Sequence, residues 1–220
     1  MIEKKFYLHL WLLLLYIPFV FIVKDFLPQN IARENGPIEN FQLVLLAVGV
    51  YLCWQAMKKT DIKYDKYIWQ AGMLFYILLF GRELSWGRAI LMHDDGTIPQ
   101  WSNLGLYGQI AHPLIGIAIV LLCILFYRGG FFHFLTTVKI PMWDLVFLIL
   151  FVVLVDVSEH YDFSIFHGEI DEELFECAMY FEMLRITSFI KNKFKNNFDL
   201  CATYIKRTNR YYSSVLYMII

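Results

Sequence analysis

Long runs without charged residues constrain this chain more than any other feature of its sequence. Residues Phe6–Val23 contain no Asp, Glu, Lys or Arg, and neither do residues Gly96–Tyr127. A helix of about 20 such residues crosses the roughly 30 Å hydrocarbon layer of a bilayer. With 59% hydrophobic and 18% charged residues, the chain is also more apolar than an ordinary soluble domain. We therefore expect an all-α integral membrane bundle.

Hydropathy and charge together predict six transmembrane helices. The predicted spans are Phe6–Val23, Asn40–Met57, Tyr67–Ile90, Ile110–Tyr127, Ile140–Asp156 and Glu172–Ile190. The sixth carries several charged residues, so a hydropathy scan alone would miss it. The sequence thus predicts a six-helix transmembrane domain over residues 1–190. A basic and aromatic tail follows over residues 191–220, either lying on an anionic membrane surface or poorly ordered.

The placement of basic residues predicts the orientation, because cytoplasmic loops are enriched in Lys and Arg. If the N-terminus is cytoplasmic and the spans alternate, only four of the 19 basic residues fall outside: Lys24, Arg33, Arg82 and Arg88. We expect both termini in the cytoplasm of a bacterial inner-membrane, multi-pass protein. Its expected partner is the lipid bilayer, with a protein partner or a homo-oligomer left open. The net charge of −1 gives no basic surface for nucleic acid.

Charged residues inside a span indicate a site, because each costs about 2.5–3.5 kcal/mol on insertion scales. In the third span, Arg82 and Glu83 lie within helical spacing of Trp86, so we expect the indole ring to cover both stems. The two adjacent charges point about 100° apart, so we expect each to pair with another helix. In the sixth span, Glu173, Glu176 and Tyr180 share one face. We predict that Arg82 or Arg88 meets Glu173 or Glu176.

The end of the fifth span adds a second set of polar residues. Asp156 and His160 are four residues apart, with Glu159 beside them. On a continuous helix this spacing places Asp156 and His160 on one face, where they could bind a divalent metal. The alternative is an ordinary acidic loop with hydrogen-bonded histidines. The candidate polar cluster therefore comprises Arg82, Glu83, Trp86, Arg88, Asp156, Glu159, His160, Glu173 and Glu176. Deeper in the sixth span, Glu182 and Arg185 are expected to form an intramembrane i, i+3 pair.

Two short motifs carry a resemblance to a known group. They are Glu83-Leu84-Ser85-Trp86-Gly87 near the end of the third span and Glu172-Glu173-Leu174-Phe175-Glu176 at the start of the sixth. Both resemble motifs of a widespread group of uncharacterised bacterial inner-membrane proteins. The resemblance implies a membrane location and a shared polar cluster, and it implies no reaction.

Three functions fit these features. In the first, the protein is not catalytic, and its polar cluster holds helices together or recognises a partner. In the second, it is a metal-assisted enzyme acting on lipid or lipid-linked substrates at the outer leaflet, with Asp156, His160 and Glu176 as ligands or acid–base groups. In the third, it is a small transporter that uses Glu182 and Arg185 as an ion or proton relay. The sequence contains no nucleophile elbow, phosphate-binding loop or zinc-finger spacing.

Overall fold

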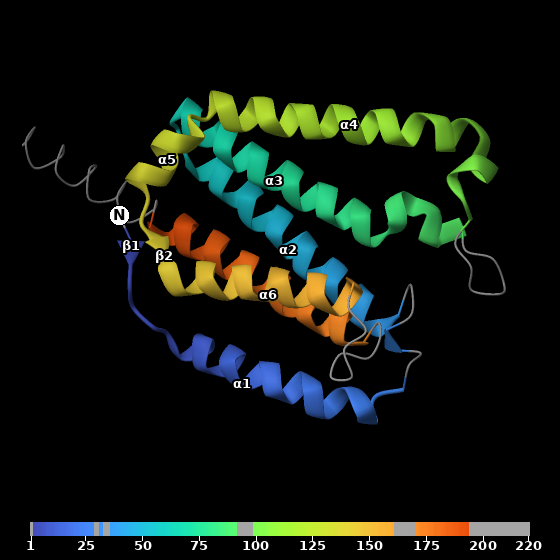
Figure 1. Cartoon of the computed structure of the whole chain (residues 1–220). Coiled ribbons are helices and arrows are strands. Elements are labelled where there is room, and N and C mark those ends of the chain that lie inside the picture. The colour runs from blue at the N-terminus through green and yellow to red at the C-terminus, as the bar shows by residue number, and fades with distance from the viewer. Residues whose placement is uncertain (1, 29–30, 33–35, 92–98, 161–169, 194–220) are drawn as a thin grey trace, which may run out of the picture.

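The computed structural model describes residues 2–28, 31–32, 36–91, 99–160 and 170–193. Apart from one short strand pair, the regular structure there is helical, as predicted. Each predicted span coincides with a long helix. These helices are α1 (Leu8–Val23), α2 (Pro37–Lys59), α3 (Lys63–Glu83), α4 (Gly105–Arg128), α6 (Met142–His160) and the helix over residues 170–193. They run alternately in opposite directions (Figure 1).

Among the residues that the structure describes, three segments are long and apolar enough to cross a membrane: Leu8–Phe26, Pro37–Lys59 and Trp101–Arg128. The other three long helices do not meet this condition, because they are less apolar or contain more charged residues. Helix α6, for example, contains Asp144 and Asp156, and the 170–193 helix contains Glu182 near its middle. The structure thus bears out a helical protein compatible with a membrane location.

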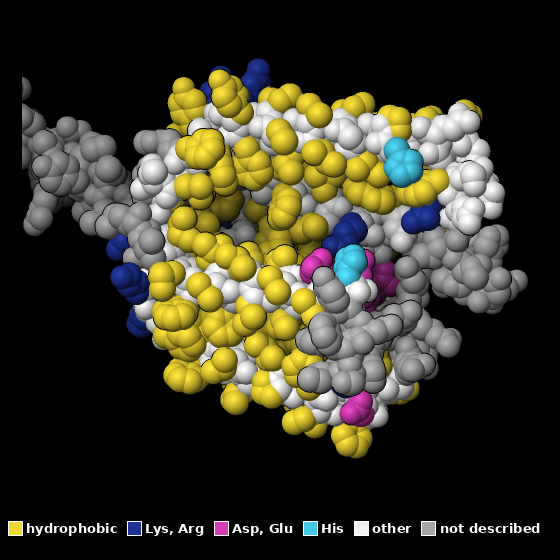
Figure 2. All heavy atoms as spheres, viewed as in Figure 1, with side chains coloured by type: hydrophobic (Ala, Val, Ile, Leu, Met, Phe, Trp, Pro, Cys, Tyr) yellow, Lys and Arg dark blue, Asp and Glu magenta, His cyan; other side chains and the backbone are white. Residues whose placement is uncertain are grey.

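The surface of the bundle is strongly apolar. Helix α4 is almost entirely exposed along its apolar stretch, and large aliphatic and aromatic side chains of α1 and α6 are exposed as well. Figure 2 shows hydrophobic side chains spread over most of one face of the bundle. Soluble monomers rarely expose an apolar patch of more than a few hundred Å². Lipid is the solvent that such a surface fits.

The most polar predicted span is the most buried helix. The 170–193 helix carries Phe175, Tyr180 and Glu182 at 0% exposure. Tyr16 of α1 donates a hydrogen bond to the Leu174 carbonyl over 2.9 Å. The hydroxyl groups of Tyr76, in α3, and Thr187 are 2.8 Å apart. A helix covered by its neighbours can carry charged residues, because protein and not lipid surrounds them.

The shorter elements join and cap the long helices. They are β1 (Ile2–Glu3), η1 (Lys24–Phe26), η3 (Ser85–Leu91), η4 (Trp101–Leu104), α5 (Phe131–Thr137) and β2 (Ile140–Pro141). Strands β1 and β2 pair in parallel, with Ile2 opposite Ile140 and Glu3 opposite Pro141. This pairing places the start of α1 beside the start of α6 (Figure 1). The predicted tail lies outside the described residues from position 194 onward.

The third predicted span ends earlier than expected. Helix α3 stops at Glu83, and Ser85 and Trp86 have φ angles of 45° and 57°. Positive φ is sterically unfavourable for residues other than glycine. The chain therefore turns sharply into η3, and the prediction of one helix up to Ile90 was wrong.

Candidate functional site at one end of the bundle

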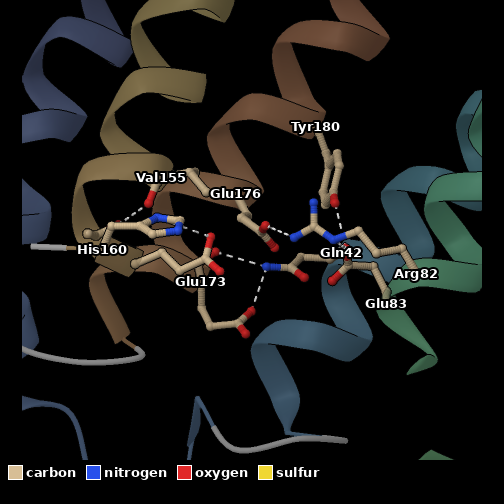
Figure 3. A network of polar contacts seen from close by, with 10 residues as sticks. Gln42, Arg82, Glu83, Val155, His160, Glu173, Glu176 and Tyr180 are labelled. Atoms are coloured by element: carbon tan, nitrogen blue, oxygen red, sulfur yellow. Dashed lines mark hydrogen bonds and ion pairs between the residues drawn. The ribbon is translucent and has the colours of Figure 1, made fainter. Parts of the chain in front are cut away.

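Three helices contribute polar side chains to one end of the bundle. These side chains, here called the polar cluster, are Gln42 of α2, Arg82 and Glu83 of α3, and Glu173, Glu176 and Tyr180 of the 170–193 helix. Figure 3 shows the three residues of the 170–193 helix pointing toward α2 and α3. Helical periodicity aligns them, as their spacing predicts.

The central ion pair of the polar cluster joins α3 to the 170–193 helix. The Arg82 guanidinium donates to the Glu176 carboxylate, as predicted. Glu176 is 2% exposed, whereas the side chain of Arg82 is 52% exposed. The arginine therefore reaches the buried carboxylate while part of its side chain stays accessible from outside the bundle.

Glu83 receives two contacts. The Tyr180 hydroxyl donates to its Oε1 over 2.6 Å, and Arg82 Nε lies 3.5 Å from the same oxygen. Arg82 and Glu83 therefore pair with each other as well as with the 170–193 helix. The expectation that they would pair only with other helices was wrong, because the long arginine side chain bends back over its neighbour.

Gln42 belongs to the polar cluster although it was not among the residues expected from the sequence. Its amide group is fully buried and donates to the Glu173 carboxylate over 2.7 Å and to the Glu173 carbonyl over 3.0 Å. A glutamine within an apolar span is a recognisable signal, because buried amides need partners. The expected cluster was built from charged residues and from the aromatic ring beside them, so an uncharged amide was passed over.

Trp86 and Arg88 lie apart from these contacts. Because the chain turns at Ser85, the Trp86 ring packs against Gly81 and does not extend the face of α3 that carries Glu83. Arg88 donates to the Ser85 carbonyl over 3.2 Å and stacks over Trp101 with its guanidinium carbon 4.5 Å from the ring centroid. The prediction that the indole covers both charged stems depended on a continuous helix and was wrong.

The residues at the end of α6 form a more exposed group. His160 Nδ1 lies 3.6 Å from Asp156 Oδ1 and 3.9 Å from Glu159 Oε2. The histidine and aspartate side chains are 59% and 70% exposed. The spacing thus places Asp156 and His160 together, as predicted. The loop that follows, residues 161–169, lies outside the described residues.

A second set of polar residues, here called the His9 cluster, lies toward the opposite end of the bundle. It consists of His9 of α1, Asp144 of α6, and Glu182 and Arg185 of the 170–193 helix. His9 Nε2 is 3.1 Å from Asp144 Oδ1, and Arg185 Nη2 is 3.3 Å from His9 Nδ1. Within the described chain, Glu182 and Arg185 form no ion pair, so their predicted pairing was wrong. Arg185 instead turns toward α1.

The His9 cluster also holds a group of metal-ligand type. One candidate ligand atom from each of His9, Asp144 and Glu182 lies within 4.8 Å of the other two. The described residues bring no third such group to Asp156 and His160 at this spacing. His9 and Asp144 were missed as site residues, although Asp144 is a charged residue within the predicted fifth span and carried the same signal as Glu182.

Comparisons with known proteins assign no function to this chain, so a functional proposal depends on the geometry of the site. No family model, no curated protein and no solved structure matches the chain.

Proposed function

We propose that this chain is a bacterial inner-membrane protein that crosses the bilayer six times, with both termini in the cytoplasm. We further propose a structural or partner-binding role in which the polar cluster ties α2, α3 and the 170–193 helix together at the extracytoplasmic end. The resemblance to uncharacterised inner-membrane proteins is part of this proposal. The orientation follows from the distribution of basic residues.

One observation carries the proposed role: four ionisable groups of the polar cluster pair with one another across the helices. Arg82 binds Glu176, and Tyr180 binds Glu83. The two carboxylates are 2% and 8% exposed. Buried charges that are paired across helices resist separation of those helices, because separation strands a charge in an apolar medium.

The exposed part of Arg82 gives the partner-binding role its surface. Its side chain is half exposed, and Figure 3 shows the Glu176 carboxylate between Arg82 and His160 of α6. The side chains of His160 and Asp156 are exposed as well. This end of the bundle presents several carboxylates together with the half-exposed Arg82. A partner that docks here would need basic or hydrogen-bonding groups to match the carboxylates.

A helix-joining role predicts unequal effects of removing two carboxylates. Glu83→Ala removes the acceptor of the Tyr180 hydroxyl and one partner of Arg82, so we expect a loss of about 3 kcal/mol in the free energy of unfolding. Glu159→Ala is the matched control. Its side chain is 56% exposed, and a surface change of this kind costs within about 0.5 kcal/mol. Thermal unfolding of both variants in detergent measures the difference. Equal melting of the two would contradict the proposed role.

The alternative function is a metal-assisted enzyme acting on lipid or lipid-linked substrates. One observation favours it. Figure 2 shows a hollow between α6 and the α3–α4 pair, with hydrophobic walls and charged and histidine side chains gathered near one end. A lipid could place its acyl chains along such walls and its head group at that end. Metal that is bound in equal ratio to the protein and lost in His160→Ala would favour this alternative.

A further inference from the structure

The His9 cluster contains carboxylate oxygens that lack partners. Asp144 is 2% exposed and Glu182 is 0% exposed. Asp144 Oδ2 and both carboxylate oxygens of Glu182 are buried and accept no hydrogen bond from the part of the chain that the structure describes. Buried polar atoms almost always have a partner, because an unpaired one loses its hydration without compensation. These oxygens therefore point to a ligand held between α1, α6 and the 170–193 helix.

The charges of the His9 cluster indicate the class of ligand. With His9 neutral, the two carboxylates outweigh the Arg185 guanidinium, so the cluster has an excess of negative charge. A cation offsets that excess. The histidine side chain is 15% exposed and the carboxylates are almost fully covered, so the site is screened from water on most sides.

The types of ligand atom in the His9 cluster indicate which cations the site prefers. Sodium, calcium and magnesium ions prefer oxygen ligands alone. One imidazole nitrogen and two carboxylates suit zinc, manganese or iron(II), and three protein ligands leave a position for water or substrate. The three candidate ligand atoms lie within 4.8 Å of one another, close enough to surround one ion after small side-chain movements.

We propose that His9, Asp144 and Glu182 bind one divalent transition-metal ion. The site joins three helices at the end of the bundle opposite the polar cluster, so it is independent of the helix-joining role proposed above and of the Asp156–His160 pair.

Arg185 disfavours metal binding at this site, because it is positively charged and contacts His9. Its Nη2 can only donate, so His9 Nδ1 accepts from it at 3.3 Å and His9 Nε2 carries a proton toward Asp144. Metal binding at Nε2 requires the other tautomer of the neutral imidazole, in which the proton leaves Nε2 and a proton is taken up at Nδ1, so the protonation of His9 does not change overall. Arg185 must then turn away from Nδ1, because that nitrogen can no longer accept a hydrogen bond. Its Nε atom has no hydrogen-bond partner among the described residues, so few contacts hold the guanidinium in place.

The test measures metal bound to the full chain purified in detergent. The protein is equilibrated with Zn²⁺ or Mn²⁺, separated from free ion by gel filtration and measured by mass spectrometry of the metal. We expect about one ion per chain. Removing a ligand in Glu182→Gln or His9→Gln should weaken binding more than about 100-fold, since even neighbours of ligands contribute about 10–100-fold.

Two further variants separate this site from the others. Glu176→Gln, in the polar cluster, and His160→Ala should both retain the metal. Arg185→Gln should bind the metal more tightly than the wild-type chain, because a partly buried positive charge near the cation is removed. This gain is an outcome that misfolding cannot produce. Circular dichroism and gel filtration identify variants that have lost their fold.

Three results would overturn the proposal. The first is a folded wild-type chain that takes up neither ion. In that case a Glu182→Gln variant as stable as the wild type would show that the carboxyl group is held protonated. The second is metal that Glu182→Gln and His9→Gln retain in a folded state. The third is metal that His160→Ala loses and these two variants keep, which would place the ion at the end of α6.

Discussion

At the scale of single residues, the backbone at Ser85 and Trp86 decides how the end of α3 is built. Both residues have positive φ angles, a conformation that costs about 1–2 kcal/mol per residue outside glycine. The turn carries the Trp86 indole back onto Gly81. A β-carbon at Gly81 would lie 2.6 Å from the Trp86 ring, so the ring leaves no room for a side chain at this position.

A substitution at Gly81 tests this contact. Gly81→Ala places a methyl group against the Trp86 ring, and we expect it to lower the free energy of unfolding by about 1–3 kcal/mol, as overpacking does. In a Trp86→Leu background the ring is gone, so the same substitution should cost much less. Unfolding of the four proteins of this cycle in detergent gives the coupling. Equal costs in the two backgrounds would show that the ring and the glycine do not meet.

At the scale of helices, α2 and α3 form a closely packed pair. Gly49 of α2 faces the ring of Tyr76 in α3, and a β-carbon at Gly49 would lie 2.4 Å from that ring. Tyr76 is 3% exposed, and its hydroxyl group is within hydrogen-bond distance of Thr187. Small residues allow helices in membranes to approach closely, since packing rather than hydrophobicity drives their association. The missing side chain at Gly49 thus lets Tyr76 of α3 contact both α2 and the 170–193 helix.

Two glycines in different helices give a matched comparison. Gly49→Ala should push Tyr76 off Thr187 and lower the free energy of unfolding by about 1–3 kcal/mol. A β-carbon added at Gly116 of α4 would meet no atom within 4 Å, so Gly116→Ala should leave stability unchanged or raise it slightly. Melting temperatures in the same detergent measure both. A Gly116→Ala loss as large as that of Gly49→Ala would contradict the packing described.

At the scale of the whole molecule, the alternating directions of the helices place their first and last residues at two opposite ends of the bundle. The connection between α2 and α3 lies at the end of the bundle where α1 begins, and η1 lies at the opposite end (Figure 1). The connection between α2 and α3, with the helix ends beside it, is rich in lysine. The sequence segments that follow α1, α3 and α6 are rich in carboxylates. The helix directions therefore agree with the alternation on which the predicted orientation depends, and the proposed orientation assigns the lysine-rich end to the cytoplasm.

Thiol labelling tests that orientation. Asp25, in η1, and Asp61, between α2 and α3, are both exposed. Each is changed to cysteine in a chain where Cys123 and Cys201 are replaced by serine, while Cys53 and Cys177 are buried and stay. A membrane-impermeant reagent should modify Asp25→Cys in intact cells and Asp61→Cys only after the membrane is opened. The reverse pattern would invert the protein in the membrane and reject the proposed cytoplasmic termini.

The sequence by itself determined the helices and their approximate bounds, and it limited one ion pair to a few alternatives. Uncharged apolar runs fix where helices form, and helical spacing places Glu173, Glu176 and Tyr180 on one face, because both are local properties of the chain. The meeting of Arg82 with Glu176 was among the expected pairs, since few basic residues lie at that end of the bundle.

Only the tertiary structure decided which polar residues meet across the bundle. His9 and Asp144 lie 135 positions apart in the chain, and no local pattern links them. Gln42 joins Glu173 for the same reason, because the rotation of each helix about its axis is set by packing against its neighbours. The sharp turn at Ser85 likewise depends on surroundings that compensate an unfavourable backbone conformation, which a periodic pattern does not contain.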